Sequence, residues 1–122
     1  MPPATLWPEP VVVVEPNPET GPVLVQIEYR IDPERVHEFR RAMRDLRRIR
    51  RRDGASRWGL FNDPVEPGCF VESFLVESWA EHMRQHGRAT EADREVEDRV
   101  SAFQVGGNEP IATHLIAEHL PR

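Results

Sequence analysis

The side chain best suited to proton transfer in this chain is a histidine on its last predicted strand, His114. We expect that strand to lie beside the first one, which carries Gln26 and Glu28. A neutral imidazole beside a carboxylate can accept a proton from a phenolic substrate near neutral pH. The pattern therefore predicts His114 as a base held by Glu28. A hydrogen-bonded pair at a subunit interface is the structural alternative.

Other side chains could hold a flat, anionic ligand. Tyr29 and Trp58 could stack against it, and Arg57 could contact an anionic oxygen. Glu77 could point into the same cavity or accept a hydrogen bond from the start of the next helix. Aromatic residues in strands also serve as core residues, so both interpretations stay open for them. Trp79 is predicted to pack in the core beneath its helix.

Two histidines, His82 and His86, are spaced so that one helix face can carry both. His86 is also a candidate ligand contact. A metal ion would need further ligands, such as Glu81 or His114, and no zinc-binding spacing of Cys and His occurs. We therefore predict neither a metal site nor a cofactor.

The composition of the 122-residue chain fits one domain with a real core. All 16 basic residues are arginines, yet the formal net charge is -5, which argues against general nucleic-acid binding. The lone cysteine, Cys69, cannot form an internal disulfide. No apolar run is long enough to span a bilayer, and no signal peptide opens the chain. These features predict a soluble, cytoplasmic protein.

Residues 1–22 hold seven of the 12 prolines and are predicted to be an extended leader or linker. The four valines of Val11–Val14 would be costly to leave in water, so this strip could instead lie against the domain or a partner chain. The domain itself is predicted to span residues 23–120.

Alternating residues over Val23–Ile31 predict a strand with one apolar face. Asp32 and Pro33 then signal a helix start. The helix is expected to run to about Arg52, with apolar residues at helical spacing on one face and arginines on the others. The arginine run over 47–52 could be an anion-binding patch or a solvated face paired with local carboxylates.

The next residues predict a hairpin from runs Arg57–Asn62 and Cys69–Glu77, joined by a connector rich in Pro and Gly. Two helices follow, Trp79–His86 and about Glu91 to Gln104, the second capped by Thr90. A last strand covers Ile111–Glu118. The order strand, helix, strand, strand, helix, strand predicts an α+β, ferredoxin-like βαββαβ fold with an antiparallel sheet.

Helices in this order can cover only one face of the sheet. The other face would still carry apolar residues from every strand. A second copy that stacks its sheet on that face would bury these residues and leave a cavity between the two sheets. We therefore expect a homodimeric α/β barrel.

Several short stretches resemble the antibiotic-biosynthesis-monooxygenase type of dimeric α/β barrel. They are Asp53-Gly54-Ala55, Arg57-Trp58-Gly59-Leu60, Asp63, Pro67, Phe70, Glu77-Ser78-Trp79 and His86. The whole chain, with its leader Trp7-Pro8-Glu9-Pro10, more narrowly resembles the soluble C-terminal extension of bacterial major-facilitator transporters of the secretion-effector type.

The resemblance implies a homodimer and leaves two functions open. One is an accessory domain that dimerises or senses a small aromatic ligand, with the transporter in cis at the inner membrane face. The other is a cofactor-independent monooxygenase acting on an aromatic, polyketide-like phenol. The family's haem-degrading branch uses an Asn on the first strand, and Val23–Ile31 contains none.

Overall fold

The computed structural model describes residues 17–86 and 89–122, without the side chains of Gln85 and His86. Most of the predicted leader, residues 1–16, therefore lies outside the described residues. The elements, in chain order, are β1 (Val23–Arg30), η1 (Pro33–Arg35), α1 (Val36–Arg52), β2 (Ser56–Asn62), β3 (Cys69–Val76), α2 (Trp79–His86), α3 (Glu91–Ser101), η2 (Val105–Gly107) and β4 (Ile111–Ile116). In the described ranges no helix has both the length and the apolar character needed to cross a membrane.

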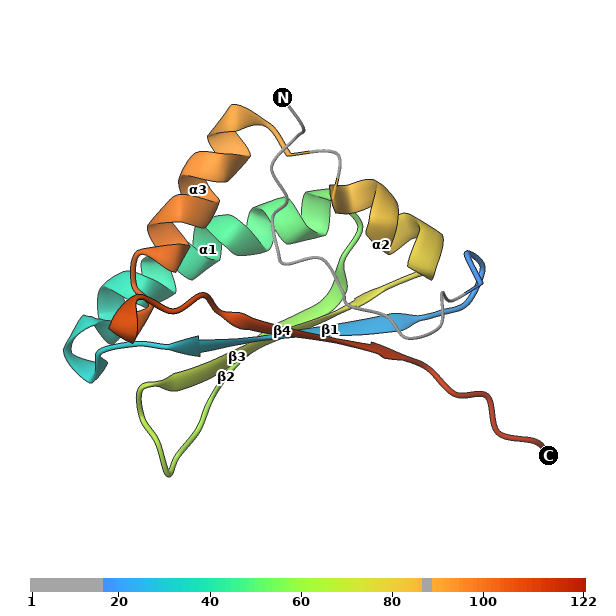
Figure 1. Ribbon diagram of the computed structural model, residues 1–122, viewed down its shortest axis with the longest axis horizontal. Coiled ribbons are helices and arrows are strands. Elements are labelled where there is room, and N and C mark those ends of the chain that lie inside the picture. The colour runs from blue at the N-terminus through green and yellow to red at the C-terminus, as the bar shows by residue number, and fades with distance from the viewer. Residues whose placement is uncertain (1–16, 87–88) are drawn as a thin grey trace.

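The four strands form one antiparallel sheet in the order β2-β3-β1-β4. The helices α1, α2 and α3 lie on the same side of this sheet, and none of the described helices lies on the other side (Figure 1). The α+β, ferredoxin-like βαββαβ fold predicted from the order of elements is confirmed.

Local capping signals set the ends of the helices. The Asp32 side chain accepts a hydrogen bond from the Glu34 amide, and Pro33 opens the 3-10 turn that leads into α1. Thr90 and Asp93 form a capping box at the start of α3. After α1, Gly54 adopts a φ of 102°, a left-handed conformation that glycine takes at little cost.

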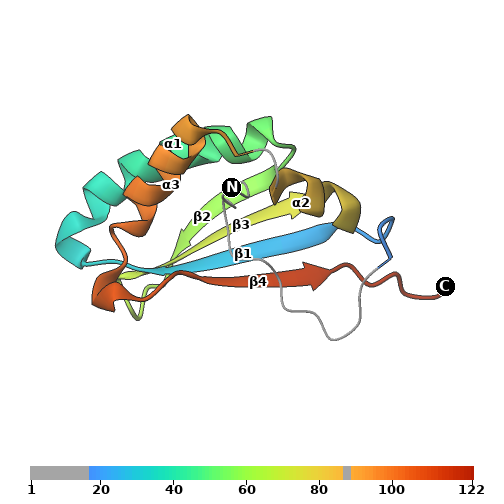
Figure 2. The ribbon, with the colours of Figure 1, turned by 45° about the horizontal axis from the view of Figure 1, so that its top comes forward.

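The core lies between α1 and the sheet. Phe39, Met43 and Leu46 of α1 are at most 1% exposed and pack against the apolar side of β1 and β3. Trp79, at the start of α2, is 4% exposed, which confirms its prediction as a core residue. Viewed obliquely, α3 runs beside α1, while α2 covers the end of the sheet where β1 begins (Figure 2).

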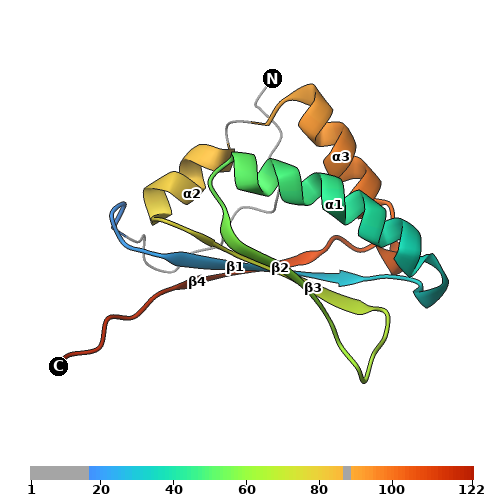
Figure 3. The same ribbon diagram turned by 180° about the vertical axis from the view of Figure 1, so that it is seen from behind.

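Seen from behind, the helices again lie on one side of the sheet and leave the other side uncovered (Figure 3). The register of the strands defines three rows of side chains on the uncovered side. The rows are Leu75-Leu24-Leu115, then Gly59-Ser73-Gln26-Thr113, then Phe61-Val71-Glu28-Ile111. Two mainly apolar rows thus flank a polar one. We call this surface the open face.

Candidate functional site

A buried carboxylate, Glu72 on β3, is the centre of a polar cluster between the sheet and the helices. Its side chain is 0% exposed and pairs with Arg50 of α1, whose Nε lies 2.9 Å from Glu72 Oε2. The Tyr29 hydroxyl donates to Oε1 at 2.7 Å, and the Trp58 indole Nε1 donates to Oε2 at 2.8 Å. We call these four residues the Glu72 cluster.

The Glu72 cluster holds its charges because each one is compensated. Burial alone would lower the pKa of Arg50, but the adjacent Glu72 carboxylate raises it, so the guanidinium keeps its proton. Burial, and then the negative charge of Glu72, raise the pKa of Tyr29 well above its usual value. Tyr29 therefore acts as a hydrogen-bond donor at neutral pH.

A second carboxylate, Glu97 on α3, is influenced by the charges of the same cluster. Burial raises the pKa of Glu97 to about 7, the Arg50 charge opposes this rise, and the Glu72 charge adds to it. Its Oε2 atom is buried and has no hydrogen-bond partner among the described residues. Glu97, which is coupled by charge to the Glu72 cluster, can therefore exchange a proton near neutral pH.

Folding stability is expected to fall as the pH rises from about 4.5 to about 7, because the folded state binds the Glu97 proton more tightly than the unfolded state. The contribution of Glu97 to stability is fully present below pH 4.5, its ordinary pKa, and is lost as the pH rises through about 7, its pKa in the folded state. A Glu97→Gln variant should flatten this part of the stability profile, as measured by urea denaturation at a series of pH values.

Glu95→Gln is the matched control, since Glu95 is an exposed carboxylate on the same helix. It should leave the profile as in the parent chain. If Glu97→Gln and Glu95→Gln gave the same profile, Glu97 would not be the group that titrates in this range.

The predicted cluster of His114 with Glu28 is wrong, because the two residues lie on opposite sides of the sheet. His114 pairs in register with Val25, a core residue, and so faces the helices. Its ring centroid lies 4.7 Å from that of His82 on α2. Burial lowers the pKa of His114, and its Nε2 is buried with no hydrogen-bond partner among the described residues.

Gln26 and Glu28 lie on the open face, as predicted, but with different neighbours. Gln26 sits opposite Ser73 and Thr113 in the polar row. Glu28 forms an ion pair with Arg30 at 2.8 Å, and its Oε1 accepts from the Cys69 thiol at 3.6 Å. The partners of the Glu28 carboxylate are therefore Arg30 and Cys69, near the hairpin, and not a histidine.

The other residues predicted to bind a ligand, Arg57, Glu77 and His86, are not placed beside Gln26 and Glu28 by any contact among the described residues. Arg57 is exposed and has a φ of 50°, at a register shift between Ser56 and Gly59. Glu77 is exposed at the end of β3. The side chain of His86 lies outside the described residues. The role of each of these in binding a ligand stays a prediction.

The sequence analysis did not identify Arg50, Glu72 or Glu97 as site residues, although the sequence pattern places Arg50 and Glu72 at buried positions. Glu72 falls on the apolar alternation set of β3, together with Phe70 and Phe74. Arg50 follows Leu46 by four residues, which places it on the buried side of α1. Two opposite charges on core positions of neighbouring elements are typical of a buried ion pair.

Comparisons with solved structures agree on the fold. A protein of Caulobacter crescentus described as a candidate antibiotic biosynthesis monooxygenase aligns with a TM-score of 0.68 and 19% identity, over 83% of this chain and 93% of that one. One of Bordetella bronchiseptica with the same description aligns with a TM-score of 0.66 and 18% identity, over 82% and 99%. No curated protein matches the chain.

A family model described as transmembrane secretion effector matches residues 1–121. The match covers nearly all of the 122 residues, and the fold agrees with the resemblance drawn from the short sequence stretches. This chain therefore belongs to the transmembrane secretion effector family and has the fold of the antibiotic biosynthesis monooxygenase structures.

Proposed function

We propose that this chain is a soluble accessory domain of a secretion-effector transporter and that it pairs with a second copy through its open face. The observation that carries the proposal is the exposure of large apolar side chains on that face. Phe61 is 61% exposed, Ile111 is 64% exposed and Leu115 is 48% exposed. In water such a surface favours association with another apolar surface.

A second copy of the chain suits this face because the three rows are self-complementary. Two sheets stacked face to face bury the apolar rows of both copies against each other. The polar row of Gln26, Ser73 and Thr113 would then border the space between the sheets. A flat aromatic ligand bound there would be the signal that the domain passes to its transporter.

The family membership supports the transporter context. We place the domain on the cytoplasmic side of the membrane, where the buried, unpaired Cys69 thiol would stay reduced. The pairing of two such domains would bring two transporter copies together.

The alternative function, a cofactor-independent monooxygenase, was implied by the family resemblance, and its predicted base was His114 held by Glu28. That pair does not form, because the two side chains lie on opposite sides of the sheet. These two solved structures share the fold, but fewer than a fifth of their aligned residues are identical to those of this chain. A shared fold at that level of identity does not transfer an activity to this chain.

Leu115→Asp is expected to convert a dimer into a monomer. The substitution places a charge in the leucine row, where stacking would bury it without a partner. Sedimentation equilibrium at micromolar concentration should give a dimer for the parent chain and a monomer for the variant. In the full-length transporter the same change should reduce export while leaving membrane insertion intact.

Ala92→Asp is the matched control, because it adds the same charge at an exposed position of α3, in the helical layer. It should leave the dimer unchanged. A parent chain that sediments as a monomer at this concentration would contradict the proposal.

A further inference from the structure

The solvent-facing side of α1 is built almost entirely of arginine. Six arginines share it: Arg40, Arg41, Arg44, Arg47, Arg48 and Arg51. Five of them are exposed, and Arg47 is half-buried with its guanidinium 5.7 Å from the centre of the Trp58 ring. At 3.6 residues per turn the six fall within an arc of about 120°, and they extend over about 17 Å of helix. His37 is the only other residue in that arc. We call these six residues the arginine stripe.

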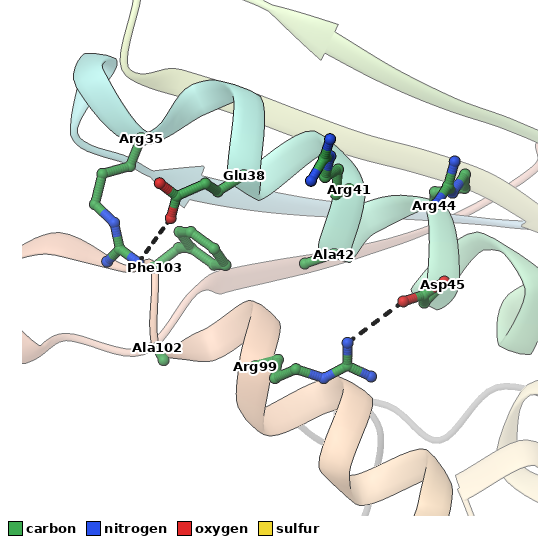
Figure 4. Close-up of a pocket in the computed structure, with 9 residues that line it drawn as sticks. All are labelled: Arg35, Glu38, Arg41, Ala42, Arg44, Asp45, Arg99, Ala102 and Phe103. Atoms are coloured by element: carbon green, nitrogen blue, oxygen red, sulfur yellow. Dashed lines mark hydrogen bonds and ion pairs between the residues drawn. The ribbon is translucent and has the colours of Figure 1, made fainter.

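The carboxylates near the stripe leave most of it uncompensated. Arg48 lies 3.5 Å from Asp45, but the other five form no ion pair with any described residue. Asp45 also forms an ion pair with Arg99 of α3 at 3.4 Å, and Glu38 forms one with Arg35. Figure 4 shows these last two pairs, with Asp45 pointing toward Arg99, whereas Arg41 and Arg44 have no partner there. Within the predicted run over 47–52, Arg48 and Arg52 pair with local carboxylates and Arg50 pairs with the buried Glu72, whereas Arg47 and Arg51 form no ion pair with a described residue.

We propose that the arginine stripe binds the anionic surface of a lipid bilayer. Like charges along one helix face repel one another, and an extended layer of lipid phosphates relieves this repulsion at every position. Clusters of four to eight arginines or lysines on a helix are typical of binding to anionic lipid. The stripe contains no apolar residue, so the contact is electrostatic and does not insert into the acyl chains.

A small anion bound in the nearby groove would contact only two of the six arginines of the stripe. The groove between α1 and α3 has a volume of about 350 Å³ and is bordered by Arg41 and Arg44. Glu38 and Asp45 line it as well, and they pair with Arg35 and Arg99, the other two arginines of the lining. The other four arginines of the stripe lie outside the groove, where a flat surface can contact them.

The presence of a bilayer next to this domain rests on the proposed function. The helix that carries the stripe, α1, lies in the helical layer, on the far side of the sheet from the open face (Figure 1). A dimer stacked through the open faces would have its two stripes on opposite outer sides. One stripe of the dimer would therefore contact a flat membrane, and binding does not require dimerisation.

The test is sedimentation of the purified 122-residue chain with vesicles. Vesicles of phosphatidylcholine mixed with an equal amount of phosphatidylglycerol should carry the chain down, and vesicles of phosphatidylcholine alone should not. Raised salt should release it, since screening shortens the reach of these charges to about 10 Å or less. Arg44→Gln with Arg51→Gln should weaken binding about 25-fold, because each basic residue contributes about fivefold.

Arg94→Gln with Arg122→Gln is the control, since it removes the same charge from exposed positions outside the stripe. It should bind like the parent chain. Equal loss in the two double variants would overturn the proposal, because only net charge would matter. Binding to a DNA duplex without binding to the vesicles would overturn it, as would release by inorganic phosphate but not by chloride at matched ionic strength.

The Leu115→Asp variant distinguishes failure of the membrane contact from failure of the proposed dimer. The variant should bind the mixed vesicles as the parent chain does, even though it is expected to be monomeric. A parent chain that is monomeric but binds the vesicles through the stripe would contradict the proposed dimer and support the membrane contact.

Discussion

Replacing Glu72 with leucine is expected to lower the free energy of unfolding by about 3–5 kcal/mol, the usual cost of breaking a buried ion pair. The substitution leaves the Arg50 guanidinium, which is 1% exposed, without its compensating charge. It also removes the acceptor for the Tyr29 hydroxyl and for the Trp58 indole. Urea denaturation of the purified variant measures the loss.

A double variant distinguishes the effect of losing the charge pairing from the effect of losing packed side-chain volume. Arg50→Met with Glu72→Leu should recover much of the lost stability, because replacing both charges with apolar groups is often neutral or better. Glu66→Leu is the matched control, since Glu66 is an exposed carboxylate that pairs with Arg30 at the surface. It should change little. A Glu72→Leu variant as stable as the control would mean that water reaches the cluster.

Phe39→Ala is expected to cost about 3–5 kcal/mol of unfolding free energy, the range for deleting a large buried aromatic side chain. Phe39 is 0% exposed. Its ring centroid lies 5.5 Å from that of Tyr29, 5.2 Å from Phe70 and 5.8 Å from Phe103. The cavity left behind would border two strands and the segment that follows α3, so no single element can move to fill it.

Phe61→Ala is the control for this prediction, because Phe61 has the same side chain on the open face. Both variants are best measured by thermal melting in the Leu115→Asp background, in which association does not contribute. Phe61→Ala should then melt near the parent. If Phe39→Ala did so too, α1 would not be packed on the sheet as described.

The sequence was enough to predict the fold because each element carries its own local signal. Asp32 and Pro33 mark the start of the first helical segment, Thr90 marks that of α3, and Gly54 marks the end of α1. Alternating apolar residues identify the strands. Errors at element ends are small: α3 ends at Ser101 rather than Gln104, whose side chain accepts from the Arg30 amide instead.

The candidate site could not be predicted in the same way, because it depends on which face of a strand is covered. The predicted cluster with Gln26 and Glu28 put His114 on the cavity face of the last strand. The register places Leu115 and Ile111 on the open face instead, and His114 toward α2. An uncovered face that binds a second copy carries the same residue types as a core, so alternation alone cannot tell the two apart.

The register shift at Arg57 limits how large an assembly can become. β2 is an edge strand of the sheet, and an edge strand offers unpaired backbone groups to any passing strand. The left-handed backbone of Arg57, with φ of 50°, breaks that row of groups near the start of the strand. Another sheet therefore pairs with only part of this edge. Growth of a continuous sheet, the route to fibrils, is disfavoured at that end of β2, while stacking of the broad face remains open.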